Sequence, residues 1–236
     1  DSVRTLFRDR SGLVWVGLQD GGLLKMKPDR QRFRYHPLPK ASEAQPLGET
    51  VTAIFEGSDR VLWVGTLYGG LIRYDRESRT HHVYRHDPGD PGSLGSNTIT
   101  AILKDGAGTL WVGTHDGGLH RFDPDQGIFH RYRHDPANRN GIGSAAVTAL
   151  SADGAGRLWV GTRNAGVSRY NRATGRFIRF RHRADDPDSI SSDAITALCA
   201  APSGHLWVGT GKDGLNRLNP ETGTVRRYRK DGKDPR

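Results

Sequence analysis

One segment of the chain fits the pattern of a nucleotide-binding loop. Residues 209–214 read Gly-Thr-Gly-Lys-Asp-Gly, which matches G-x-G-x-x-G and follows a predicted strand. That chemistry requires a helix directly after the loop, because the first amide groups of the helix bind the pyrophosphate. Residues 215–218 continue as a strand instead, and Gly209 and Gly214 recur throughout the chain. The sequence therefore predicts a turn here and no cofactor.

The ten histidines are the second chemical candidate, because neutral imidazole is a common metal ligand. His86, His134 and His182 lie 48 residues apart, and Lys230 follows at the same interval. A regular interval of this length puts each one in a different repeat, too far apart to share one ion. G-x-S-x-G is absent, and no isolated carboxylate pair occurs. We expect no metal site, no catalytic residue and no enzyme in this chain.

Composition excludes further classes of protein. No stretch of the 236 residues approaches the roughly 18 consecutive apolar residues of a membrane-spanning helix. The single cysteine, Cys199, excludes an internal disulfide. The net charge is +9, but the basic residues recur with the same 48-residue interval, as at Arg121 and Arg169. Charge spread in this way predicts a solvated rim and no nucleic-acid partner.

The tryptophans define an internal repeat. All five lie inside the phrase L/V-W-V-G at intervals of 48 residues: Trp15, Trp63, Trp111, Trp159 and Trp207. A fixed interval of this length is the signature of a repeat architecture. We expect one repeat domain over residues 1–236, with units at about 1–48, 49–96, 97–144, 145–192 and 193–236.

Each unit reads as four short strands separated by glycine-rich turns. In the third unit the expected strands are Thr98–Leu103, Leu110–Thr114, Leu119–Phe122 and Phe129–His134. A single sheet of this size cannot bury both faces, so the sheets must stack face to face. The predicted fold is an all-β propeller of five four-stranded antiparallel blades, with a tryptophan in the seam beside each blade.

The repeat resembles the two-component regulator propeller. That family's pattern is S-L-S-x-N-x-V-x-x-I-x-x-D-x-x-G-x-L-W-V-G-T-x-x-G-G-L-x-x-Y/F-D, and Ser93–Asp123 and Ser189–Asn219 follow it almost position by position. The third and fourth strands of the first unit depart from it, and Arg60 replaces a turn glycine. The resemblance implies the extracytoplasmic sensor region of a hybrid histidine kinase, a periplasmic location and an output kinase domain outside this chain. Because such rings usually have seven blades, it also implies a longer array, with a closed ring of five blades as the alternative.

The turns between the second and third strands vary from unit to unit within a constant frame. Such turns emerge at one end of a propeller, where polar side chains would bind a polar ligand such as an oligosaccharide or a peptide. We expect Tyr68 and Arg163 to contribute most, because both carry planar groups. The complete set of expected ligand-binding residues is Gln19, Asp20, Tyr68, His115, Asp116, Arg163, Asn164 and Lys212.

Three functions follow from these observations. The first is a non-catalytic sensor module that binds a ligand or a second copy of itself and passes the change to the output domain. The second is a scaffold that binds proteins constitutively. The third is a hydrolase or lyase acting on a polysaccharide, which would need a carboxylate or histidine cluster at the centre of the ring.

Overall fold

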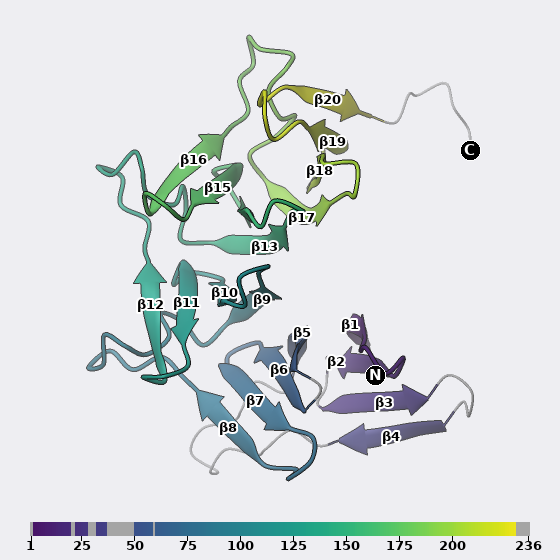
Figure 1. Cartoon of the computed structure of the whole chain (residues 1–236). Helices are drawn as coiled ribbons and strands as arrows, with labels where there is room; N and C mark the ends of the chain where they lie inside the picture. The colour runs from purple at the N-terminus through teal and green to yellow at the C-terminus, as the bar shows by residue number, and fades with distance from the viewer. Residues whose placement is uncertain (1, 20–21, 28–31, 37–49, 59, 230–236) are drawn as a thin grey trace. The chain divides into compact units, whose positions relative to one another are not determined.

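The computed structural model describes residues 2–19, 22–27, 32–36, 50–58 and 60–229. These residues form twenty strands and no helix, so none of them forms a helix that could cross a membrane (Figure 1). The chain divides into two compact units. The first holds residues 1–102 and 110–131, and the second holds residues 103–109 and 132–236.

Five antiparallel sheets contain four strands each, in sequence order. The first sheet has β1 (Val3–Arg8), β2 (Val14–Leu18), β3 (Leu23–Lys27) and β4 (Arg32–His36). The second has β5 (Val51–Ser58), β6 (Val61–Thr66), β7 (Leu71–Asp75) and β8 (His81–Tyr84). The third has β9 (Ile99–Lys104), β10 (Leu110–Thr114), β11 (Leu119–Asp123) and β12 (Ile128–Tyr132).

The fourth sheet has β13 (Val147–Ala152), β14 (Leu158–Thr162), β15 (Val167–Asn171) and β16 (Arg176–Phe180). The fifth has β17 (Ile195–Ala200), β18 (Leu206–Thr210), β19 (Leu215–Leu218) and β20 (Val225–Tyr228). The predicted five-sheet, all-β fold is therefore confirmed. The third sheet differs slightly from expectation, because β9 begins at Ile99 and β12 ends at Tyr132, two residues before His134.

The departures from the repeat pattern have only local effects. In the first sheet β3 still pairs with β4 in unbroken register, from Leu23 opposite His36 to Lys27 opposite Arg32. In the second sheet β5 extends to Ser58, and its pairing with β6 shifts between Glu56 and Ser58.

Buried clusters join neighbouring sheets within each unit. Trp15 of β2 shares a cluster with Val51 and Ile54 of β5, and Trp63 of β6 shares one with Ile99 of β9. In the second unit, Trp159 of β14 is fully buried in a cluster with residues of the fifth sheet. The side chain of Trp207, in contrast, is only half-buried. The large apolar side chains therefore stabilise the packing of one sheet on the next.

A basic residue stands directly across the ladder from every tryptophan. Trp15 faces Lys25, whose Nζ lies 5.1 Å from the ring centroid, and Trp159 faces Arg169, whose Cζ lies 5.7 Å from it. The other cross-strand pairs are Trp63 with Arg73, Trp111 with Arg121, and Trp207 with Arg217. Cations over an indole face are attracted by its quadrupole, which gives Lys25 and Arg169 a structural role.

Candidate functional site

The expected ligand-binding residues lie in the turns between the second and third strands. The side chains of His115, Asp116, Arg163, Asn164 and Lys212 are exposed, and that of Gln19 is half-buried. Asp20 lies outside the described residues. Tyr68 belongs to the first compact unit and Arg163 to the second.

A repeated set of hydrogen bonds holds these turns. In the fourth sheet, Thr162 Oγ1 donates to the carbonyl of Gly166 (2.9 Å) and accepts from the amide of Ala165 (3.1 Å). Gly166 has a φ of +71°, and a Cβ there would lie 2.2 Å from the carbonyl oxygen of Phe180. Only glycine fits that position. The hydrogen bonds of Thr162 and the glycine at position 166 therefore fix the backbone of the turn, so the residue types at positions 163 and 164 can differ between units.

Tyr68 differs from the residues at the equivalent position of the other described turns. Its φ is +76°, and Arg79 is the only other non-glycine residue with a positive φ in the described part of the chain. The Tyr68 side chain is 68% exposed. A left-handed backbone is costly for a bulky residue and is often found at binding sites. The left-handed backbone and the exposed ring support Tyr68 as a ligand-binding candidate in the first unit.

A cavity of about 740 Å³ opens in the second unit, away from these turns. It is lined by the turn between β13 and β14, by residues 169–172, by Gly106 and Ala107, and by Glu221. The strands are antiparallel, so the β13–β14 turn lies at the opposite end of its sheet from Arg163. The expected ligand-binding residues do not line this cavity.

A buried aspartate organises one wall of the cavity. Asp153 Oδ2 accepts hydrogen bonds from the indole N–H of Trp159 (2.8 Å) and from Arg157 Nε (2.7 Å). Burial by itself raises the pKa of Asp153, but these bonds and the charge of Arg157 outweigh it, so the pKa lies below its usual range. Asp153 is therefore a carboxylate at neutral pH.

The same aspartate recurs at Asp9 and Asp105. Asp9 accepts from the indole of Trp15 at 2.9 Å, and Asp105 accepts from the amides of Ala107 and Thr109. Both carboxylates also bind an arginine from the following sheet, Arg76 in one case and Arg172 in the other. Sequence reasoning missed this role, although the 48-residue interval and the D-x-x-G pattern carried the signal.

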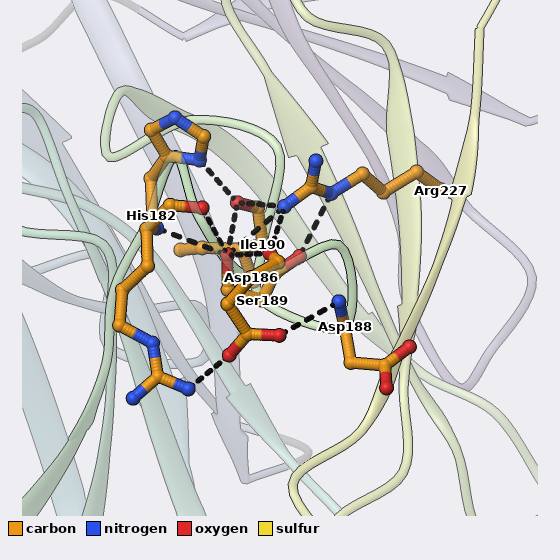
Figure 2. Close-up of polar contacts among 7 residues, drawn as sticks. His182, Asp186, Asp188, Ser189, Ile190 and Arg227 are labelled. Carbon is orange, nitrogen blue, oxygen red and sulfur yellow. Dashed lines mark hydrogen bonds and ion pairs between the residues drawn. The ribbon is translucent and has the colours of Figure 1, made fainter.

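A periodic set of arginines in the last strands of the sheets binds the connections between sheets. Figure 2 shows the member of this set in the fifth sheet. Arg227 of β20 donates to the carbonyl oxygens of Ser189 (2.9 Å) and Asp186 (2.8 Å) in the connection before β17. Arg131 and Arg179 make the corresponding bonds in the third and fourth sheets. These three arginines are 48 residues apart, yet sequence reasoning missed them as well.

The periodic histidines fasten the same connections. The Nδ1 atoms of His86, His134 and His182 lie 2.7, 3.1 and 2.8 Å from the carbonyl oxygens of Leu94, Ile142 and Ile190, respectively. Lys230 lies outside the described residues. Within the described ranges, no three His, Cys, Asp or Glu side chains form a group that could hold a metal ion.

Replacing Arg227 with alanine should loosen the connection before β17. Its guanidinium supplies several charge-assisted bonds to carbonyls of this connection, so the amides of residues 186–190 should exchange with solvent about tenfold faster. Hydrogen–deuterium exchange with mass spectrometry measures this. The matched control is Arg226→Ala, because Arg226 lies over the ring of Tyr228 (5.3 Å) instead of on the connection. Equal exchange in both variants would contradict the role assigned to Arg227.

The fold and part of the sequence match known proteins. Residues 93–116, 141–164 and 189–212 match the family described as two component regulator propeller. No curated protein matches the sequence.

Three solved structures are similar to the chain. One is the extracellular domain of a protein described as a hybrid two component system from B. thetaiotaomicron, with TM-score 0.78, 23% identity, and coverage of 95% of this chain and 29% of that one. The second is the extracellular domain of a protein described as a one component system from the same organism, with TM-score 0.73, 25% identity, and coverage of 97% and 31%. The third is virginiamycin B lyase from Staphylococcus aureus, with TM-score 0.69, 16% identity, and coverage of 96% and 69%.

This chain spans less than a third of the two B. thetaiotaomicron structures, 29% and 31% of their lengths. The similarity to the lyase, at 16% identity, concerns the fold alone. The five four-stranded sheets and the three matched segments agree with the resemblance that the sequence predicted. This chain has an all-β propeller fold, and three of its segments match the family described as two component regulator propeller.

Proposed function

We propose that this chain is a non-catalytic sensor module of a bacterial two-component signalling protein. The observation that carries the proposal is the match of three 24-residue segments to two component regulator propeller repeats. The similarity to extracellular domains of two component and one component systems supports it and favours an extracytoplasmic location. On this proposal, the output kinase domain belongs to a longer protein.

The proposed sensing residues lie in the turns between the second and third strands, considered in each compact unit by itself. The exposed, left-handed Tyr68 supports this assignment in the first unit, and the rigid frame around Arg163 supports it in the second. An aromatic ring stacks on a sugar or peptide group, and a guanidinium donates in a fixed planar fork. The proposed ligand is an oligosaccharide or another polar molecule of that kind.

Titration calorimetry against a panel of oligosaccharides tests the proposal. We expect at least one to bind, with affinity falling about tenfold or more when Tyr68 or Arg163 is replaced with alanine. Asn138→Ala is the matched control, since Asn138 is a polar residue of a connection and should leave affinity unchanged. If a bound oligosaccharide were unaffected by Tyr68→Ala and Arg163→Ala, the assignment of these turns would be wrong.

Further measurements on the same protein separate the alternatives. A ligand-dependent change in sedimentation would favour sensing through a second copy, whereas partner binding that does not depend on any ligand would favour a constitutive scaffold. Turnover of a bound oligosaccharide would contradict the non-catalytic assignment.

A further inference from the structure

We propose that the 740 Å³ cavity of the second unit binds a small ligand through a carboxylate or another oxyanion. Arg157, Arg169 and Arg172 all line it. They come from three places in the fold: the β13–β14 turn, the strand β15, and the residue after β15. This site is separate from the turns that contain Arg163 and does not rest on the sensing function proposed for them.

The three guanidinium groups are held in place by contacts with the protein. Arg169 Nη1 donates to the carbonyl oxygen of Pro220 at 2.6 Å while its Cζ lies 5.7 Å from the Trp159 ring centroid. Arg172 binds the carboxylate of Asp105 and, through Nη1, Thr109 Oγ1 at 3.3 Å. Each guanidinium has five N–H donors, and these bonds use only one or two of them. Further donors of fixed direction are therefore available on the cavity wall.

Glu221 shows which chemical group this wall accepts. Its carboxylate reaches across from the turn between β19 and β20 and accepts from Arg157 Nη1 at 2.5 Å. The Glu221 side chain is 75% exposed, so this carboxylate comes from the solvent side. Water screens an ion pair whose acidic partner is this exposed, so the pair contributes little to stability. A ligand carboxylate or phosphate oxygen can therefore replace Glu221 on Arg157 at low cost.

The charge balance favours an anion once Glu221 is displaced. Asp105 and Asp153 are buried carboxylates that already accept hydrogen bonds from backbone amides. They offset two of the three guanidinium charges, and Glu221 offsets the third. A ligand that displaces Glu221 therefore meets one uncompensated positive charge, together with oriented donors that fit an oxyanion.

The cavity also has room for such a ligand. A Cβ added at Gly154 or at Gly156 would meet nothing within 4 Å, so the space over this turn is open. A volume of about 740 Å³ lies within the range of small-molecule sites. Tyr170 supplies an aromatic edge to the wall, with its hydroxyl 3.1 Å from that of Tyr132.

The test uses the whole chain, with citrate as the carboxylate probe and inorganic phosphate as the second oxyanion, at constant ionic strength. We expect at least one of the two to bind in titration calorimetry. Tighter binding of citrate would identify a carboxylate ligand, and tighter binding of phosphate a phosphorylated one. An absence of binding by both probes would overturn the proposal.

Variants localise the binding. Glu221→Gln removes the competing carboxylate from an exposed position without disturbing the fold, so the affinity should increase several-fold, by about three- to tenfold. Arg169→Met should weaken binding about tenfold or more. Arg226→Met is the matched control and should bind as the parent does, because Arg226 is exposed, lies over the ring of Tyr228 and does not line the cavity. If Glu221→Gln did not change the affinity, or if Arg226→Met weakened it as much as Arg169→Met, the cavity would not be the site.

Discussion

Replacing Arg76 with alanine should lower the free energy of unfolding by about 3–5 kcal/mol. Arg76 Nη1 lies 2.7 Å from Asp9 Oδ2, and Nη2 lies 2.5 Å from Glu56 Oε1. The two carboxylate side chains are 0% and 4% exposed, respectively. Removal of the guanidinium leaves two buried negative charges without their shared cation, and this uncompensated burial causes the loss. Urea denaturation followed by tryptophan fluorescence measures it.

The control for this prediction is Arg60→Ala. The Arg60–Glu77 pair has a comparable separation of 2.6 Å, but its side chains are 64% and 66% exposed. Water screens such a pair, so its loss should cost less than about 1 kcal/mol. If Arg76→Ala lowered the free energy of unfolding no more than Arg60→Ala does, the buried contacts of Arg76 with Asp9 and Glu56 would not stabilise the first unit.

The effect of Arg76→Ala should also depend on pH. Burial by itself raises the pKa of Asp9, but hydrogen bonds from Ser11, Trp15 and Leu13 and the charge of Arg76 together lower it below the usual value. A lowered pKa gives stability that is present above the unfolded pKa, near 4, and lost as the pH falls through the folded pKa. The parent therefore loses this contribution in acid, and the difference between parent and variant should narrow below about pH 4.

Replacing Trp159 with alanine should cost about 3–5 kcal/mol through the cavity that it leaves. Trp159 is fully buried between the fourth and fifth sheets, and its indole also satisfies Asp153. The variant thus loses apolar packing and leaves a buried acceptor with one bond fewer. Thermal unfolding followed by circular dichroism gives the change in Tm.

Trp207→Ala is the matched control, because it removes the same side chain at the equivalent position of the fifth sheet. The side chain of Trp207 is only half-buried in this chain, so we expect about half the loss. Equal losses of protein stability in the two variants would mean that burial between sheets does not determine how much a tryptophan contributes to stability.

The repeated apolar residues made the fold predictable, whereas the polar contacts between sheets could not be predicted. Trp159 and Gly166 recur because a seam and a left-handed turn admit few alternatives, so their spacing alone identified the strands. Arg157 and Glu221, in contrast, are 64 residues apart and match no periodic partner. The contacts that shape the cavity arise from long side chains of neighbouring sheets, and no local pattern encodes them.

For the variable turns, the sequence predicted which side chains are exposed but not the backbone conformation. Exposure of Arg163 and Lys212 followed from their position between two glycines of a tight turn. The left-handed backbone of Tyr68 could not be predicted, because tyrosine has no preference for the left-handed region of φ and ψ. The sequence on either side of Tyr68 also resembles that of the other turns.

The arginine contacts to the connections have a consequence for how such a chain can grow. Arg131 lies in the last strand of the third sheet and binds Asp90 and Ser93, which precede its first strand. The arginine thus joins the last strand of a sheet to the connection that precedes the first strand of the same sheet. A duplicated stretch from the connection to this arginine would carry its fastening with it, so blades could be inserted or deleted in whole numbers without new contacts having to evolve.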